Sequence, residues 1–199
     1  MDKAQFYRLF NLSPLNCSTH QFRYELVSNK PTRQAAVLIA ITERNGQLEI
    51  LLTRRSAHLK HHAGQVSFPG GKAEPSDESL TITALREFEE EIGIARNQIK
   101  LLGCLNPYQT ISGFDVLPVI GFLEPPIETN IDQNEVDEVF FVPLSHCLDV
   151  QNHLHVDTQI KGQPYQVTFI PYQDHNIWGA TAAMLKDFAN HLQQTKRLV

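Results

Sequence analysis

The sequence predicts an α+β protein, an α/β/α sandwich in which a mixed β-sheet carries helices on its faces. Short apolar runs typical of strands dominate the middle of the 199-residue chain. Segments with helical periodicity are few and well separated. This combination favours helices packed on a sheet, because each element must bury its apolar face against another layer.

The first elements follow from apolar patterning. Residues 3–12 carry apolar side chains at helical spacing, so we expect a short helix there. Residues 35–42 and 48–53 predict two strands. The dipeptide Asn45-Gly46 between them is a strong signal for a tight hairpin turn.

The second half of the sequence predicts further strands and two more helices. The first of these helices is expected from about Glu78 to Ile92, with Ser76 or Asp77 as its N-cap and Gly93 as its end. The remaining expected elements are strands at 99–104, 116–122, 136–142, 154–157 and 165–170, and a final helix from about Trp178 to Gln193.

The composition is that of one ordinary globular domain covering residues 1–199. The chain is 42% hydrophobic and 20% charged. It has neither an apolar run of the roughly 20 residues that a membrane helix needs nor a secretory signal, so we expect a cytoplasmic protein without membrane contact. A net charge of −5 disfavours a general nucleic-acid binder. Cys17, Cys104 and Cys147 show no metal-ligand spacing and are expected to be reduced, mostly buried thiols.

The predicted helix at 78–92 concentrates acidic residues in its last turns. At about 100° per residue, Glu87, Glu90 and Glu91 share an arc of roughly 100°, and Glu89 points away from them. The opposite side carries apolar residues that can pack against a sheet, namely Leu85, Phe88 and Ile92. Three carboxylates near a helix C-terminus repel one another and the helix dipole. A hard divalent cation such as Mg²⁺ reverses this penalty, because it binds carboxylate and phosphate oxygens.

The loop before this helix, Phe68-Pro69-Gly70-Gly71-Lys72, supplies a second element. Paired glycines let a backbone approach a ligand closely. We expect Gly70 to offer a carbonyl to the same cation and Gly71 to lie against the substrate. A simple turn and a solvated acidic face are the alternatives for either element alone, and their adjacency favours a metal site.

Residues 70–94, GGKAEPSDESLTITALREFEEEIGI, resemble the Nudix box, G-x5-E-x7-R-E-U-x-E-E-x-G-U, where U is a bulky apolar residue. The half REFEEEIGI matches throughout and is highly specific. Six residues, not five, separate Gly71 from Glu78, which leaves the backbone ligand open. The resemblance places the box at about residues 71–94. It implies the Nudix fold and hydrolysis of a diphosphate that joins a nucleoside to another group.

The resemblance also implies residue roles. Glu87 and Glu91 are expected to bind Mg²⁺ or Mn²⁺, with Glu90 as a further ligand or as the general base. Glu135 is the second candidate for the base. The metals offset phosphate charge and lower the pKa of a bound water. The supporting residues are Arg86, whose i,i+4 partner is Glu90, and Glu78.

Residues 51–71, LLTRRSAHLKHHAGQVSFPGG, are similar to an additional motif of coenzyme A pyrophosphatases. Lys60 stands where that motif has Arg, which keeps the charge but not the planar fork. Residues 54–62 contain basic and histidine side chains and no acid, which suits a substrate with three phosphates. We therefore expect coenzyme A or a derivative as the substrate, held by Arg54, Arg55, Lys60 and Gly71.

Two other functions stay open. The first is a Nudix pyrophosphatase for ADP-ribose, NADH or another nucleoside diphosphate derivative, and the additional motif at residues 51–71 argues against it. A Nudix-fold regulator that binds a nucleotide without turnover is disfavoured, because every carboxylate position is filled. A homodimer is left open. Trp178 is expected in the core or as a staple of the last helix.

Overall fold

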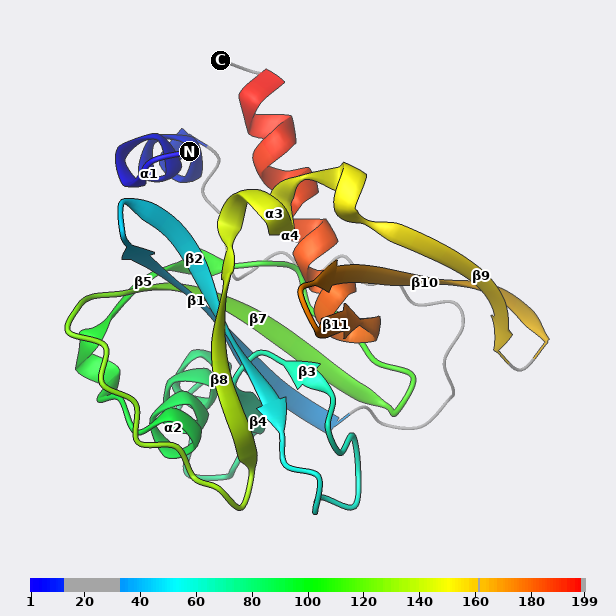
Figure 1. The fold of residues 1–199 in the computed structure, drawn as a ribbon. Coiled ribbons are helices and arrows are strands. Elements are labelled where there is room, and N and C mark those ends of the chain that lie inside the picture. The colour runs from blue at the N-terminus through cyan, green and yellow to red at the C-terminus, as the bar shows by residue number, and fades with distance from the viewer. Residues whose placement is uncertain (13–32, 161, 198–199) are drawn as a thin grey trace.

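The computed structural model describes residues 1–12, 33–160 and 162–197, and its centre is a mixed sheet with helices on both faces (Figure 1). The strands of this main sheet are β1 (Arg33–Arg44), β2 (Gln47–Arg55), β3 (Val66–Ser67), β4 (Gly70–Lys72), β5 (Ile99–Cys104), β6 (Tyr108–Gln109), β7 (Phe114–Leu123) and β8 (Val136–Pro143). They run in the order β3-β2-β1-β7-β5, with β4 also on β1, β6 on β7 and β8 on β2. β1 and β7 are parallel and the other pairs are antiparallel, so the predicted α+β class is confirmed.

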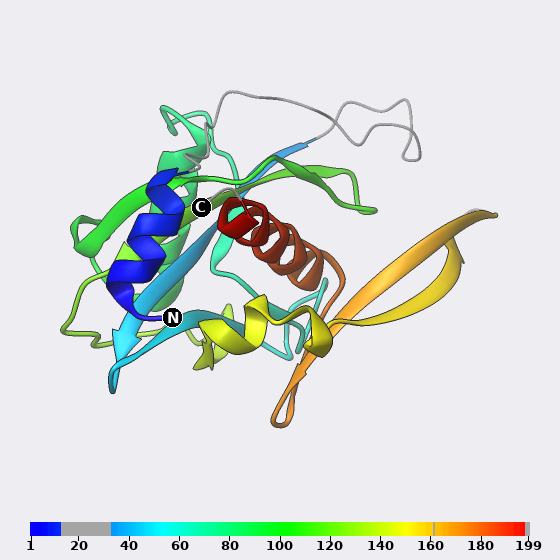
Figure 2. The ribbon, with the colours of Figure 1, turned by 90° about the horizontal axis from the view of Figure 1, so that it is seen from above.

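The C-terminal part adds a second, three-stranded sheet. Its strands are β9 (Leu154–Ile160), β10 (Gln163–Tyr172) and β11 (His175–Trp178). β9 and β10 form a long ribbon that projects from the rest of the molecule (Figures 1 and 2). The helical segments are α1 (Lys3–Leu12), α2 (Leu80–Ile92), α3 (Leu144–Leu148), α4 (Gly179–Arg197) and the 3-10 turns η1 (Arg96–Gln98) and η2 (Val150–Asn152).

The core lies on both faces of β1. Ile39 and Ile41 belong to the apolar cluster that α1 and α4 cover, and Leu38 and Ala40 belong to the cluster that α2 covers with Phe88. All five side chains are fully buried. Successive side chains point to opposite faces of a strand, and therefore a strand covered on both sides needs a continuous apolar run.

The predicted hairpin between β1 and β2 is confirmed. Asn45 and Gly46 have φ values of 51° and 73°. Two consecutive positive φ values match the right-handed twist of the flanking strands, which is why this dipeptide marks the turn.

Other expectations need correction. Trp178 is 40% exposed and stacks on Phe169 with ring centroids 6.1 Å apart, so its placement in the core is wrong. Cys147 is a free buried thiol, but Cys104 is disulfide-bonded, contrary to the expected reduced state, and Cys17 lies outside the described residues. The strands missed by the patterning are the short ones, which have two to four residues. Within the described ranges, no helix has the length and apolarity required to cross a membrane.

Candidate active site

Helix α2 is fixed by a cap at each end and by one apolar face packed on the sheet, and these contacts set the direction of its carboxylates. Ser79 is the N-cap and accepts a hydrogen bond from the backbone N–H of Ile82, so the predicted caps Ser76 and Asp77 are wrong. Gly93, with φ 74°, ends the helix as predicted. The face packed on the sheet is formed by buried Ala84, Leu85, Phe88 and Ile92. Glu87, Glu90 and Glu91 form the carboxylate cluster. Glu89 points to another side, where it pairs with Arg96 Nε at 2.6 Å, and it takes no part in this cluster.

The glycine loop lies between β1 and α2 because only glycine fits there. β4 pairs with β1, so that Gly70 stands opposite Val37. A Cβ on Gly70 would lie 2.4 Å from the carbonyl oxygen of Ala36. A Cβ on Gly71 would lie 2.6 Å from the carboxylate of Glu87. The two glycines therefore bring the backbone against both the sheet and the acidic face of the helix.

Glu91 is the most buried member of the acidic face. Its Oε2 accepts a hydrogen bond from Gly70 N at 3.2 Å, and its Oε1 lies 3.5 Å from Arg55 Nη1. The residue is 2% exposed. Burial raises the pKa of its carboxyl to about 8, although Arg55 and the Gly70 N–H oppose the shift. Oε1 accepts no hydrogen bond, so the single ion pair does not compensate this buried charge.

Arg86 organises the neighbouring carboxylates. Its Nε and Nη2 donate to the two oxygens of Asp77 at 3.0 and 2.9 Å. Its Nη1 donates to Glu87 at 3.0 Å and to Glu90 at 2.9 Å, and Nη2 also donates to the Lys72 carbonyl at 3.2 Å. One guanidinium thus links the loop, the helix start and the acidic face.

Asp77, and not Glu78, supports this network. The hydrogen bond from Arg86 is the main cause that lowers the pKa of Asp77, and the Glu74 N–H and the Thr83 hydroxyl also donate to it. Glu78 is exposed and forms no hydrogen bond with the described residues, so it makes none of the contacts of this network. The sequence holds a signal for this, because five residues separate Gly71 from Asp77 while Glu78 stands one further.

The two candidates for the general base differ in their surroundings. The Glu90 side chain is 59% exposed and bound to Arg86. Glu135 is partly buried, and its backbone carbonyl accepts a hydrogen bond from Ser56 N at 2.8 Å. Burial raises the pKa of Glu87, Arg86 opposes that shift, and Glu90 and Glu135 add to it. Glu135 also raises the pKa of Glu91, so it lies within electrostatic reach of both carboxylates.

The donor set of this cluster fits a hard divalent cation. Among the described residues, no three His, Cys, Asp or Glu side chains already surround a common point for a metal. Arg86 and Arg55 instead contact Glu87 and Glu91. All the donors are oxygens, and one buried oxygen of Glu91 lacks a hydrogen bond, so a cation would supply the positive charge that the cluster lacks.

The two arginines predicted to hold the substrate, Arg54 and Arg55, lie on opposite faces of the sheet. Arg55 faces α2 and Glu91, whereas Arg54 pairs with Glu138 at 3.0 Å on the opposite face. Adjacent strand residues point to opposite faces, so β2 cannot bring both to one substrate. Lys60 is exposed in the loop of residues 56–65, which leaves β2 directly after Arg55.

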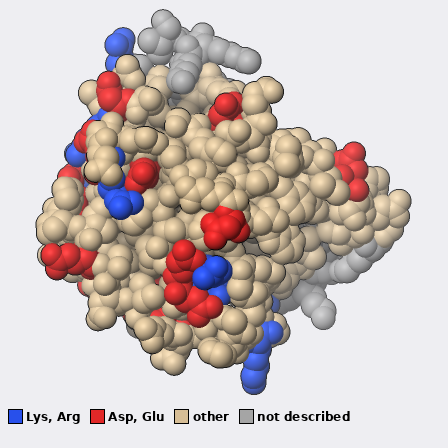
Figure 3. All heavy atoms as spheres, in the orientation of Figure 1, with Lys and Arg blue, Asp and Glu red and all other residues tan. Residues whose placement is uncertain are grey.

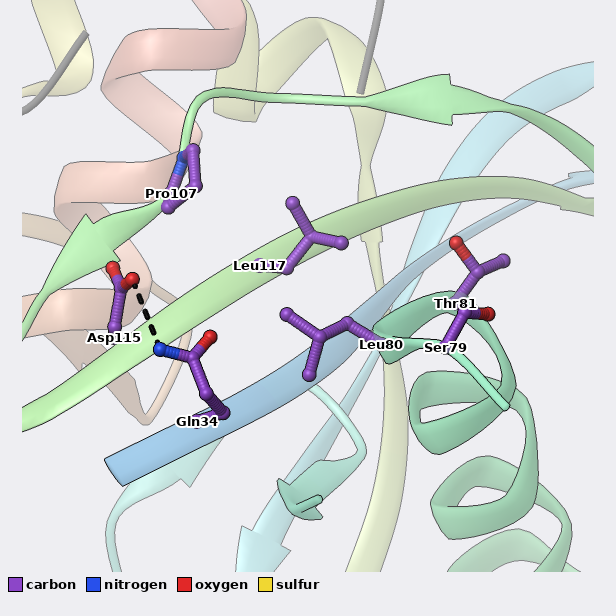
Figure 4. Close-up of a pocket in the computed structure, with 7 residues that line it drawn as sticks. All are labelled: Gln34, Ser79, Leu80, Thr81, Pro107, Asp115 and Leu117. Carbon is purple, nitrogen blue, oxygen red and sulfur yellow. Dashed lines mark hydrogen bonds between the residues drawn. The ribbon is translucent and has the colours of Figure 1, made fainter. Parts of the chain in front are cut away.

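A separate cavity of about 250 Å³ lies beside the N-terminal end of α2 (Figure 4). Its walls come from β1, β7, the first residues of α2 and Pro107. Asp115 in this wall accepts a hydrogen bond from Gln34 Nε2 at 3.4 Å. None of the residues predicted for metal or substrate lines it, so this cavity is distinct from the carboxylate cluster.

Comparison with known proteins agrees with this geometry. The model of the NUDIX domain matches residues 32–160, which is more than half of the chain. A protein named uncharacterized Nudix hydrolase NudL from Photorhabdus laumondii subsp. laumondii is 43% identical over 161 residues, covering 81% of this chain and 86% of its own. The protein of that name from Enterobacter sp. (strain 638) is 39% identical over 157 residues, covering 79% and 81%.

The fold is also found in solved structures. The crystal structure of the MutT protein from Methanosarcina mazei Go1 has a TM-score of 0.51 with this chain at 21% identity, covering 86% of this chain and 97% of its own. The family match includes the acidic helix and the glycine loop. The chain therefore belongs to the NUDIX family and is a Nudix hydrolase.

Proposed function

We propose that this hydrolase cleaves the diphosphate of coenzyme A or a close derivative and gives 3′,5′-ADP and 4′-phosphopantetheine or its acyl form. The observation that supports the substrate is the position of Arg55, which lies within residues 51–71 and contacts Glu91 of the acidic helix. The loop that follows Arg55 carries an exposed Lys60 and no acid up to residue 65. Arg55 therefore lies at the edge of the carboxylate cluster, and the loop that carries Lys60 begins there, where the phosphates of a substrate need positive charge.

In this proposal Glu87 and Glu91 hold Mg²⁺ or Mn²⁺, with the carbonyl of Gly70 as a backbone ligand. When bound there, such a metal would offset phosphate charge and would lower the pKa of a water molecule. Arg86 keeps Glu87 in place while its other nitrogens hold Asp77. Gly71 brings the loop backbone against the carboxylate of Glu87, where any side chain at position 71 would strike the proposed metal ligand.

Glu135 is the better candidate for the general base. A base must reach the attacking water, which the metal ligands position. Glu135 is close enough to Glu87 and Glu91 to raise the pKa of both, whereas Glu90 is largely exposed and bound to Arg86. We therefore infer that Glu90 supports Arg86 and that Glu135 accepts the proton.

Arg54 has no part in the proposed substrate contacts, because its ion pair with Glu138 lies on the far face of the sheet. Arg55 and Lys60 remain. Arg55 is the inner of the two, since it contacts a buried carboxylate, and Lys60 is exposed in the loop. This order assigns Arg55 to the diphosphate and Lys60 to a more distant phosphate.

The decisive experiment compares substrates and identifies products. Coenzyme A, acetyl-coenzyme A, dephospho-coenzyme A, ADP-ribose and NADH are incubated with Mg²⁺ or Mn²⁺, and the products are identified by mass spectrometry. Glu87→Gln and Glu89→Gln form a matched pair, because they remove one carboxylate each from different sides of α2. We expect coenzyme A to be the preferred substrate and only the first variant to lose activity by orders of magnitude.

The outcomes separate the remaining possibilities. Far better cleavage of ADP-ribose or NADH would reject coenzyme A and keep the Nudix chemistry. Binding of these nucleotides without any turnover would identify a regulator instead of an enzyme. Single-turnover hydrolysis in ¹⁸O-labelled water should place the label in a product phosphate, since the described site offers carboxylates and no paired Ser or Cys nucleophile.

A further inference from the structure

The ribbon formed by β9 and β10 carries almost no charge. Asp157 is the one Asp, Glu, Lys or Arg in the two strands. Figure 3 shows the projecting ribbon as a nearly uncharged part of this face, while acidic and basic side chains gather on the body beside it. Within the described residues, β9 pairs only with β10, so its other edge is open. Soluble proteins usually protect such an edge with Lys, Pro or a bulge, and β9 has none of these.

One face of the ribbon is apolar and open to solvent. Leu154 and Val156 on β9 are 55% and 52% exposed, and Trp178 on β11 is 40% exposed. Leu154 stands opposite Phe169, which stands opposite Trp178, and Val156 stands opposite Val167. Directly opposed residues share a face of a sheet, and these five therefore form one apolar surface. Apolar surfaces of this kind mark sites of association.

The edge of β9 is complementary to itself. If two copies pair antiparallel with Val156 on the two-fold axis, Val156 meets the same residue of the partner. Leu154 then faces the partner's Thr158, and His155 faces the partner's Asp157, a donor opposite an acceptor. A register centred on Asp157 would instead oppose two carboxylates, which is destabilising.

We propose that two copies of this chain form a dimer by pairing along β9, centred on Val156. The pairing joins the two three-stranded sheets into one six-stranded sheet. Because both copies use the same surface in an isologous interface, the open backbone N–H and C=O groups of β9 are paired in each copy. It also places the apolar surfaces of the two copies side by side.

The mass of the protein in solution tests this proposal. Light scattering or sedimentation is measured from about 1 to 100 µM, the range in which a small interface assembles. We expect a dimer whose dissociation constant rises at least about tenfold in Val156→Asp, because two carboxylates then meet on the axis. Gln163→Asp is the control, since it adds the same charge to β10, away from the open edge. A monomer throughout, or a dimer unaffected by Val156→Asp, overturns the proposal.

Two further variants keep the test valid if Val156→Asp fails to fold. His155→Asp opposes two acidic residues across the edge and should weaken the dimer, and the double change His155→Asp with Asp157→His should restore it. Val156→Cys should form a disulfide between copies on mild oxidation, and Gln163→Cys should not. Failure of both the restoration and the crosslink rejects the register, and capture of a different protein on a monomeric chain rejects the second copy as occupant.

Discussion

Replacement of Glu91 by Gln should separate stability from catalysis. Glu91 is 2% exposed, and burial raises the pKa of its carboxyl to about 8 from its ordinary value of 4.5. Between pH 4.5 and about pH 8, Glu91 of the folded chain keeps a proton that Glu91 of the unfolded chain has released. The free energy of unfolding therefore falls as the pH rises, by about 1.4 kcal/mol per pH unit. From about pH 5.5 to about pH 7.5, the metal-free protein should lose roughly 3 kcal/mol relative to Glu91→Gln, which has no proton to release.

Urea unfolding in a metal chelator at these two pH values measures the difference. Glu89→Gln serves as the control and should follow the parent protein, because Glu89 lies on another side of the helix with Arg96. With Mg²⁺ present, Glu91→Gln should lower kcat at least about a hundredfold, since the substitution removes a proposed metal ligand. An equal pH dependence in the parent protein and in Glu91→Gln would show that Glu91 is already ionised in the metal-free fold, and the reasoning from burial would be refuted.

Three further substitutions, two of them with a matched control, test the residues around the carboxylate cluster. Asp77→Asn should lower kcat about tenfold or more by releasing Arg86, and Glu78→Gln should change little; equal kinetic effects of the two would contradict the assigned network. Arg55→Ala should lower kcat/KM for coenzyme A and dephospho-coenzyme A about equally, by roughly tenfold or 1.4 kcal/mol, while Arg54→Ala leaves both values nearly unchanged. Gly71→Ala should cost about a hundredfold in kcat, because its Cβ would stand 2.6 Å from the Glu87 carboxylate; unchanged kinetics would show that the loop yields without consequence.

Local geometry explains what could be predicted from the sequence. The spacing of Glu87, Glu90 and Glu91 predicts a shared side of α2, because a helix repeats every 3.6 residues whatever surrounds it. The turn at Asn45-Gly46 depends on the φ values of two residues, and it too is local. The continuous apolar run of residues 35–42 predicts a strand covered on both faces, because successive side chains of any strand point to opposite faces. These features are each decided within a few residues of chain.

Only the tertiary structure decided which of two neighbouring residues reaches its partner. Asp77, and not Glu78, reaches Arg86, because the loop from β4 sets where α2 begins. Arg55, and not Arg54, reaches Glu91, because the pairing of β2 with its neighbours determines which face of the strand lies under α2. The burial that raises the pKa of Glu91 likewise comes from packing between elements distant in the chain. The spacing of residues along the chain determines the directions in which side chains point within one helix or strand. Contacts between elements depend instead on strand register, loop length and the packing of layers, which no local pattern contains.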